Sequence, residues 1–295
     1  MPVLVPGPAS PSLTQRMAML SNFAMVKVSY KVFPDGESYI RLEEPIKDDV
    51  AIVVQSCPPP QDKRIIELLQ LIDASLRAGA SKVVVIVPYL AYSRQDKVFL
   101  NYEALSSKIV ARVIESVGAH AFITVNAHSE MVLSYFKIKA LSADAFPEIA
   151  AYLSSLNLKN PLILSPDKKR YPEAQRVAKL LNAEATFFEK KRDLVTGGIT
   201  TEERPLNVED RDVIIIDDII SSGGTVANAA RIVSRGNPKR IVAACIHGLY
   251  AAGAVDKLVA AGVQEIISTD TIETKTSRIS VARPLLESLR QVVED

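Results

Sequence analysis

The sequence contains few of the residues that build disulfide frameworks or structural metal sites. It has two cysteines in 295 residues, and it has no tryptophan. Cys57 and Cys245 are far apart in the sequence and form no CxxC motif, so neither a disulfide framework nor a zinc site is predicted. We therefore expect a protein of a reducing compartment, with a cytoplasmic location.

Long apolar runs and an excess of one charge are also absent. No apolar run reaches the roughly 18–20 residues that span a bilayer, and the N-terminal stretch lacks the basic region of a signal peptide. The 35 basic and 34 acidic residues leave a net charge of +1, whereas nucleic-acid-binding proteins usually carry a basic excess or stripe. We expect no membrane and no nucleic acid as partners, but small molecules or further copies of this chain.

Short β-branched apolar runs alternate with segments of helical period, and this pattern predicts parallel α/β layers. Because the runs are almost wholly apolar, we expect strands that are covered by helices on both faces. Strands are expected at residues 51–54, 82–87, 121–125, 162–164, 213–216, 240–245 and 265–267. Helices are expected at residues 62–78, 102–117, 146–156, 171–181 and 225–234. Asn101 is expected to cap the second helix, with Glu103 in its first turn.

The chain is longer than one hydrophobic core usually organises, so two domains are expected. We place the boundary near residues 141–144, which gives domains at 1–142 and 143–279 and a tail at 280–295 that can pack on the first domain. Residues 7–41 are punctuated by prolines and are expected to be irregular. Residues 189–207 are expected to form a mobile surface loop of the kind that often carries function.

The most specific chemical signal is the segment VIIIDDIISSGGT at residues 213–225. A strand is expected to end at Asp217 and Asp218, followed by a glycine-containing turn and a helix that begins near Thr225. Ligands of open parallel sheets bind at the carboxyl ends of the strands. Gly223 and Gly224 allow backbone N–H groups to approach a phosphate closely, and the helix N-terminus adds positive potential.

The other side chains of this segment suit a sugar phosphate. Ser221, Ser222 and Thr225 offer hydroxyl donors to phosphate oxygens, while the acidic pair can accept hydrogen bonds from vicinal sugar hydroxyls or hold a hydrated Mg²⁺. The plainer alternative is a strand with a polar end and an ordinary glycine-rich turn. A Walker A loop is excluded, because the Gly-Lys-Ser/Thr ending is missing.

The segment resembles the phosphoribosyl diphosphate (PRPP) binding loop of type I phosphoribosyltransferases and of PRPP synthetases, the ribose-phosphate diphosphokinases. Further segments resemble the synthetases in particular: FPDGE at 33–37, PYLAYSRQD at 88–96, VNAH at 125–128, LSPD at 164–167 and KKR at 190–192. The resemblance implies two doubly wound parallel-sheet domains of phosphoribosyltransferase-like architecture. The segments at 245–250 and 270–273 look closer to archaeal members.

The resemblance also implies a role for each matching residue. ATP would be bound by Phe33, Asp35, Glu37, Arg94, Gln95, Asp96 and His128. Ribose 5-phosphate would be bound by Asp217, Asp218, Ser221, Ser222, Gly223, Gly224 and Thr225. Lys190 and Arg192 would be the catalytic residues that close over the reacting phosphates, and His128 and Asp167 would line the Mg²⁺ site.

In the reaction that this resemblance implies, the anomeric hydroxyl of ribose 5-phosphate attacks the β-phosphorus of ATP, with Mg²⁺ as the cofactor, and PRPP and AMP form. The FPDGE segment would complete the adenine site of a neighbouring subunit, so a homo-oligomer, at least a dimer, is expected. Two alternatives stay open: a non-catalytic regulatory subunit of the same family, and a phosphoribosyltransferase.

Some residues depart from the commoner family pattern. Ser221 stands where many members have an aspartate, which removes one negative charge near the ribose. Asn126 replaces a frequent aspartate and puts the orientation of His128 in question. Lys168 and Lys169 stand where the family usually has glycines, so close backbone contacts there are in doubt.

Several of the named residues also have a purely structural interpretation. Arg94 and Asp96 could form a local salt bridge, and the basic run at 190–192 could be a solvated charge cluster. His120 is expected to be structural, and the role of His247 is left open.

Overall fold

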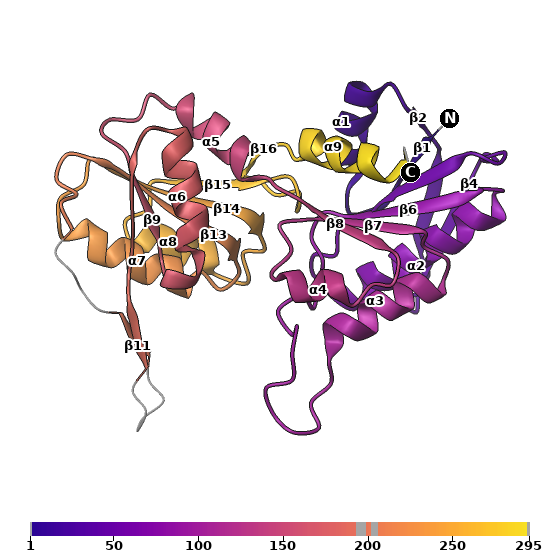
Figure 1. The fold of residues 1–295 in the computed structure, drawn as a ribbon, viewed down its shortest axis with the longest axis horizontal. Coiled ribbons are helices and arrows are strands. Elements are labelled where there is room, and N and C mark those ends of the chain that lie inside the picture. The colour runs from indigo at the N-terminus through magenta and orange to yellow at the C-terminus, as the bar shows by residue number, and fades with distance from the viewer. Residues whose placement is uncertain (1, 193–198, 202–205, 294–295) are drawn as a thin grey trace. The chain divides into compact units, whose positions relative to one another are not determined.

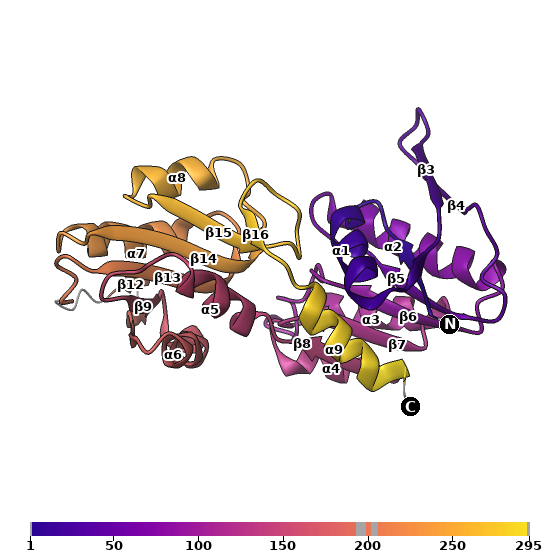
Figure 2. The ribbon, with the colours of Figure 1, turned by 90° about the horizontal axis from the view of Figure 1, so that it is seen from above.

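The structure, a computed structural model, describes residues 2–192, 199–201 and 206–293. The chain folds into two compact units, each built around a parallel sheet (Figures 1 and 2). Unit 1 comprises Met1–Asp144, Thr271–Glu273 and Ser280–Asp295, and unit 2 comprises Ala145–Asp270 and Thr274–Ile279. The expected α/β class is confirmed.

Unit 1 contains a sheet with the strand order β2-β1-β5-β6-β7-β8, and every pair in it is parallel. Its strands are β1 (Val3–Pro6), β2 (Ala24–Met25), β5 (Val50–Val54), β6 (Lys82–Val87), β7 (Ala121–Val125) and β8 (Lys139–Ala143). Its helices are α1 (Pro11–Ser21), α2 (Gln61–Arg77), α3 (Ser106–Ser116), α4 (Glu130–Ser134) and α9 (Ala282–Val293). In Figure 1, α1 and α9 lie above this sheet and α2 and α3 below it. This two-sided cover explains why the central strands are wholly apolar.

A separate antiparallel hairpin belongs to unit 1. It consists of β3 (Val28–Val32) and β4 (Ser38–Leu42), and Val32 pairs with Ser38 next to the turn. Figure 2 shows it standing away from the parallel sheet. We call residues 33–37, which join the two strands, the hairpin tip.

Unit 2 repeats the doubly wound plan with the strand order β10-β9-β13-β14-β15-β16. Its strands are β9 (Leu162–Ser165), β10 (Glu184–Phe187), β13 (Asp212–Ile220), β14 (Arg240–Gly248), β15 (Glu265–Thr269) and β16 (Ser277–Ile279). Its helical segments are α5 (Phe146–Ser154), the 3₁₀ turn η1 (Lys168–Arg170), α6 (Tyr171–Leu180), α7 (Gly224–Ser234) and α8 (Ala254–Ala260). A short hairpin of β11 (Lys190–Arg192) and β12 (Ile199–Thr201) lies within the segment that we expected to be a loop. We name residues 221–225 the β13–α7 loop.

The strand at the centre of unit 2 is longer than the apolar pattern predicts. We expected it at residues 213–216, but β13 continues to Ile220 and therefore contains the acidic pair. Strand β14 runs beside it to Gly248, so that Asp217 lies opposite Cys245 and Ile219 opposite His247. Pairing with a neighbouring strand overrides the low strand propensity of aspartate, and the prediction that the strand ends before the acidic pair is wrong.

The helix expected at residues 102–117 begins later, at Ser106. Tyr102 has a φ of +67°, which no right-handed helix allows. The Glu103 carboxylate accepts the N–H groups of Phe99 and Leu100 at 2.8 and 3.1 Å. Glu103 therefore stabilises a loop and not the first turn of the helix, and Asn101 is not the N-cap.

The proline-rich stretch 7–41 is more regular than expected. It contains α1, with Pro11 in the first turn of the helix, where the missing N–H of proline costs no hydrogen bond. It also contains β2, β3 and most of β4. The prolines in this stretch mark the start of a helix and the tip of a hairpin.

Candidate active site

The β13–α7 loop connects the central strand of unit 2 to the N-terminus of α7. Gly223 is the N-cap of α7 and has a φ of +70°, in the left-handed region. A Cβ atom at Gly223 would also lie 3.2 Å from the Ala254 carbonyl oxygen. Both the backbone conformation and the packing therefore require glycine at this position.

Gly224 differs from Gly223, because nothing in the protein itself requires it to be glycine. Its φ lies outside the left-handed region, and an added Cβ would meet only Ser222 Oγ, at 3.8 Å. The N–H groups in the first turn of α7 have no partners within the helix, and the helix dipole makes this end positive. These N–H groups and the positive helix end suit an anion. An anion bound at this turn would leave no room for a side chain at Gly224.

The loop that leads from β14 to α8, together with α8 itself, supports the β13–α7 loop. The Ala251 N–H donates to the Ser221 carbonyl oxygen at 3.0 Å. Lys257 Nζ donates to the Ser222 carbonyl oxygen, also at 3.0 Å. These bonds hold two carbonyl groups of the β13–α7 loop, so the loop has a defined shape within unit 2 alone.

The two carboxylates of the acidic pair have different surroundings. Asp218 accepts the Ile219 N–H at Oδ1 (2.9 Å), and its Oδ2 accepts from the Arg170 guanidinium. Asp217 accepts the Asp218 N–H at 2.9 Å. Burial, together with the nearby charges of Asp218 and Asp167, raises the pKa of the Asp217 carboxyl well above its usual range. Asp218 is thus held by a cation, whereas Asp217 lies among other carboxylates.

Arg170 is a residue of this site that the sequence analysis missed. Its side chain is only 13% exposed, and its guanidinium bonds both Asp218 and Glu173, the latter at 3.2 Å. In the sequence it follows two lysines and reads as the end of a surface basic cluster. Its only signal there is its position three residues after Asp167, in the turn that follows β9.

Asp167 caps the turn that contains Arg170. One oxygen of its carboxylate accepts the Arg170 N–H at 3.3 Å, and η1 follows directly. Lys168 and Lys169 take part in this 3₁₀ turn with exposed side chains. The turn therefore forms with ordinary backbone geometry where the family usually has glycines.

The hairpin tip of unit 1 presents Phe33, Asp35 and Glu37 to solvent. The Phe33 ring is 39% exposed and meets the Tyr39 ring edge to face, with 6.0 Å between the centroids. Lys31 Nζ lies 4.4 Å from the Phe33 centroid. Asp35 accepts the Glu37 N–H at 3.2 Å, which shapes the turn. The tip therefore offers an aromatic ring with a cation beside it.

The segment at 94–96 and His128 also lie in unit 1, after β6 and β7 respectively. Asp96 accepts the Ser129 hydroxyl at 2.6 Å. This bond is the main cause of a lowered pKa of Asp96, to which the charge of neighbouring His128 contributes. Gln95 Oε1 accepts from the Ser106 hydroxyl at the start of α3, at 2.7 Å. The fold therefore brings Asp96 and His128 together, because both follow the carboxyl ends of adjacent strands.

Arg94 is exposed, and in the described part of the chain it forms no ion pair with Asp96. Asn126, which precedes His128 by two residues, has a φ of +39° and donates its side-chain amide to Asp144 at 3.1 Å. Asparagine tolerates this left-handed conformation better than most residues.

The remaining predicted residues can be placed only in part. Lys190 and Arg192 belong to β11 by their backbone, but their side chains lie outside the described residues, as do residues 193–198 and 202–205 entirely. His120 Nδ1 accepts the Val83 N–H at 3.1 Å, which is a structural contact. His247 is buried in β14.

Neither a ready metal cluster nor a membrane helix is found in the described ranges. No three or more His, Cys, Asp or Glu side chains gather there as metal ligands would. No helix among the described residues is long and apolar enough to cross a bilayer.

Two doubly wound units, one of which carries an acidic pair and a glycine-containing turn at the start of a helix, define a protein of the phosphoribosyltransferase fold class. Residues 2–118 match the N-terminal domain of ribose phosphate pyrophosphokinase, and residues 130–278 match the phosphoribosyl transferase domain. The chain belongs to the ribose-phosphate pyrophosphokinase family, which is a family of enzymes.

Individual relatives extend this result over the whole chain. The ribose-phosphate pyrophosphokinase of Sulfolobus acidocaldarius is 38% identical over 95% of this chain and 96% of its own length. Ribose-phosphate pyrophosphokinase 2 of Archaeoglobus fulgidus is 40% identical over 97% and 99%. The crystal structure of phosphoribosylpyrophosphate synthetase from Mycobacterium smegmatis superposes with a TM-score of 0.86 at 27% identity, and covers 99% of both chains.

Proposed function

We propose that this chain is a PRPP synthetase, which transfers the β,γ-diphosphoryl group of ATP to the anomeric hydroxyl of ribose 5-phosphate and releases AMP. The observation that carries the proposal is the match to ribose-phosphate pyrophosphokinases along nearly the whole chain, with both units included. A phosphoribosyltransferase domain alone would account for residues 130–278 only. Unit 1 would carry the nucleotide segments and unit 2 the ribose 5-phosphate loop.

Ribose 5-phosphate would bind to unit 2. The first turn of α7 and the hydroxyls of Ser221, Ser222 and Thr225 would hold the 5-phosphate. Asp217 and Asp218 would accept hydrogen bonds from the ribose hydroxyls. Asp218 supports this role because Arg170 holds its carboxylate in one orientation. Ser221 fits as well, because a neutral hydroxyl next to a phosphate causes no charge repulsion.

ATP would bind to the segments of unit 1. Adenine would stack on Phe33, whose ring is exposed and is already flanked by Tyr39 and Lys31. Arg94 would pair with phosphate oxygens, because an exposed guanidinium that forms no ion pair with Asp96 is available for an anion. Gln95 and Asp96 are held by Ser106 and Ser129. They would fix the position of this segment beside the nucleotide.

The chemical step needs positioning and charge neutralisation more than covalent catalysis, so no enzyme nucleophile is proposed. The anomeric oxygen would attack the β-phosphorus in line, the bond from the β-phosphorus to the α,β-bridging oxygen would break so that this oxygen leaves with AMP, and the hydroxyl proton would pass to water. Lys190 and Arg192 would supply two cations that stabilise the negative charge of the transition state.

Mg²⁺ is the cofactor that this chemistry implies, and the carboxylates of unit 2 fit it. Mg²⁺ prefers oxygen ligands and usually takes only one or two carboxylates together with phosphate oxygens and water. Asp167 lies close enough to Asp217 for their charges to repel each other, and a cation would relieve that repulsion. Asp167 would therefore hold Mg²⁺, while the assignment of His128 rests on the family resemblance. When bound, Mg²⁺ neutralises phosphate charge.

The exposure of the hairpin tip is relevant to the oligomeric state of the protein. Its ring and two carboxylates are exposed at the end of a hairpin that stands away from its own sheet (Figure 2). We propose that the tip completes the adenine site of a second copy, which makes the active form at least a dimer. Both cysteines are buried and unpaired, in keeping with a cytoplasmic enzyme.

The first experiment is phosphorus NMR of the purified protein with ATP, Mg²⁺ and ribose 5-phosphate. The expected result is that AMP and PRPP form together, only when both substrates are present. Formation of ADP would mean attack at the γ-phosphorus and would refute diphosphoryl transfer. Nucleotide binding without turnover would favour a regulatory subunit, and activity with PRPP and a nucleobase without ATP would favour a phosphoribosyltransferase.

A further inference from the structure

The hairpin of β3 and β4 has one face toward α2 and one toward solvent. Because side chains alternate along a strand, Tyr30 and Ser38 lie on the same face, and Lys31 and Tyr39, which pair across the strands, lie on the other. The second face carries the ring cluster with Phe33. The orientation of the tip therefore depends on how the first face is attached.

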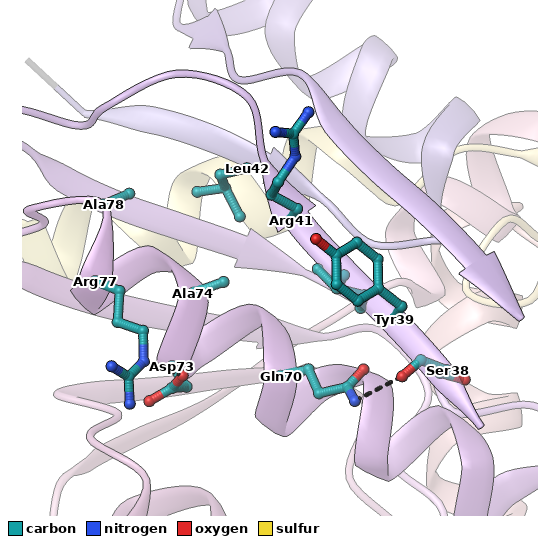
Figure 3. A pocket seen from close by; sticks show the side chains of 10 residues that line it. Ser38, Tyr39, Arg41, Leu42, Gln70, Asp73, Ala74, Arg77 and Ala78 are labelled. Atoms are coloured by element: carbon teal, nitrogen blue, oxygen red, sulfur yellow. Dashed lines mark hydrogen bonds and ion pairs between the residues drawn. The ribbon is translucent and has the colours of Figure 1, made fainter. Parts of the chain in front are cut away.

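Apolar packing attaches this face only in part. A pocket of about 380 Å³ lies between β4 and α2, lined by residues from Ser38 to Leu42 and by Gln70, Asp73, Ala74, Arg77 and Ala78. Figure 3 shows the pocket, with the one hydrogen bond that crosses at its end, from Gln70 Nε2 to the Ser38 carbonyl oxygen at 2.9 Å. Since the pocket leaves part of the space between strand and helix unfilled, polar contacts contribute to holding the hairpin in place.

Those polar contacts converge on Glu67 of α2, whose side chain is fully buried, with 0% exposure. Its Oε1 accepts the Tyr30 hydroxyl at 2.8 Å and the Ser38 hydroxyl at 3.1 Å. One carboxylate oxygen therefore holds both strands of the hairpin. Hydrogen bonds to a charged group are stronger than those between neutral groups.

The other oxygen of Glu67 is tied to the body of unit 1. Oε2 accepts Arg64 Nη1 at 2.7 Å and Gln55 Nε2 at 3.2 Å. Gln55 directly follows β5 and is fully buried. It lies at the carboxyl edge of the sheet, where the segment at 94–96 also follows its strand. Glu67 thus connects the hairpin to the sheet edge that bears the other nucleotide segment.

We propose that Glu67 is a positioning residue for nucleotide binding: it touches no substrate, but fixes the direction in which the hairpin presents Phe33, Asp35 and Glu37. This inference rests on the proposed role of the hairpin tip in ATP binding. The burial of a charged side chain is costly unless its partners are in place. The carboxylate therefore favours the one hairpin orientation in which both hydroxyls reach it.

The test removes the two hairpin contacts and keeps Glu67. We would measure ATP binding to the Tyr30→Phe/Ser38→Ala protein by calorimetry without ribose 5-phosphate, and then KM for each substrate and kcat. Loss of hydrogen bonds to a charged group is expected to weaken ATP binding about tenfold, and to leave KM for ribose 5-phosphate unchanged. The single variant Ser38→Thr, which keeps the hydroxyl, should bind ATP like the unmodified protein. Glu67→Gln should show the larger loss if it folds.

The matched control is Ser29→Ala, which removes a hydrogen bond from the same hairpin to Glu43 and not to Glu67. This variant should bind ATP like the unmodified protein. Unchanged ATP binding in the double variant, or an equal loss in Ser29→Ala, would overturn the role of Glu67. If the unmodified protein binds ATP but forms no PRPP, the proposed function fails, while the calorimetric comparison still tests Glu67.

Discussion

The β13–α7 loop of unit 2 and the hairpin tip of unit 1 hold their side chains by different means. A backbone N–H of the loop after β14 and a lysine of α8 bond two carbonyl groups of the β13–α7 loop, and its glycine conformation is set locally. The hairpin tip has exposed side chains, and its attachment is one buried carboxylate, which accepts from Tyr30 in β3 and from Ser38 beside the turn.

This difference suggests a division of work between the units. A small, highly charged sugar phosphate suits a loop of fixed backbone donors, because such donors lose little freedom when the ligand binds. A nucleotide base suits an exposed aromatic ring, which gains most when a ligand or another surface covers it. Substitutions in unit 2 should therefore affect catalysis and ribose 5-phosphate most, and those in the hairpin should affect ATP.

The largest effect is expected from Lys190→Ala, because a cation over the reacting phosphates acts mainly in the transition state. By analogy with the loss of one oxyanion donor, kcat should fall by ~10²–10³ while ATP still binds. Single-turnover kinetics and nucleotide titration measure the two effects separately. Lys191→Ala is the matched control, because it removes a neighbouring lysine to which the family resemblance assigns no role, and it should retain activity. Near-normal turnover of Lys190→Ala would contradict the catalytic assignment.

Arg170→Met tests whether the fixed orientation of the acidic pair matters. The substitution removes the cation from Asp218, whose side chain is only 10% exposed, so a loss of about 3 kcal/mol in the free energy of unfolding is expected. KM for ribose 5-phosphate should rise about tenfold or more, with little change for ATP. Denaturant unfolding and steady-state kinetics measure both. Lys168→Met, at an exposed position in the same turn, should change neither, and an equal rise in both KM values would count against a role specific to the sugar.

The two glycines of the β13–α7 loop separate folding from binding. Gly223→Ala should cost about 1–3 kcal/mol in the free energy of unfolding, because alanine is strained at a φ of +70°. Gly224→Ala should fold normally, since its Cβ has room, but should weaken ribose 5-phosphate binding if the backbone there approaches the phosphate. Thermal unfolding and KM compare the pair. Full affinity of the Gly224→Ala protein would mean that the phosphate binds elsewhere.

The smallest effect is expected from Phe33→Ala at the hairpin tip. Base stacking on an aromatic ring contributes ~1–3 kcal/mol, so KM for ATP should rise about tenfold with unchanged kcat. The free energy of unfolding should change little, because Phe33 is 39% exposed and lies at the tip of the hairpin. Val32→Ala, which removes another exposed apolar side chain of the hairpin, serves as the control. A loss of stability without a change in KM would make Phe33 a structural residue.

Apolar periodicity predicted the elements that are buried on both faces. The strands at 82–87 and 121–125 were predicted to the residue, because a fully covered strand must be apolar along its whole length. The pattern failed where polar residues sit inside an element or hydrogen bonds decide its end. The apolar pattern predicted that β13 ends before Asp217, whereas the strand contains the acidic pair. It also predicted that α3 begins at Tyr102, whereas the Glu103 carboxylate accepts a backbone N–H of the preceding loop.

The residues of the candidate site also fall into those that the sequence reveals and those that only the structure reveals. The acidic pair, the glycines and the FPDGE segment could be recognised because their chemistry lies on consecutive residues. Arg170 and Glu67 could not, because each acts on residues distant in the sequence: Asp218 is 48 positions from Arg170, and Tyr30 is 37 positions from Glu67. A lone arginine after two lysines, or a glutamate in an amphipathic helix, carries no signal of its partner.

The sequence by itself determined the α/β class, the central apolar strands of both sheets and the family, because these depend on local patterns of apolar residues and on contiguous motifs. Only the tertiary structure decided which carboxylate of the acidic pair is held by a cation, which glycine the backbone requires, and which buried glutamate anchors the hairpin. These properties arise from pairwise distances and burial, and folding creates both by bringing together residues that the chain keeps apart.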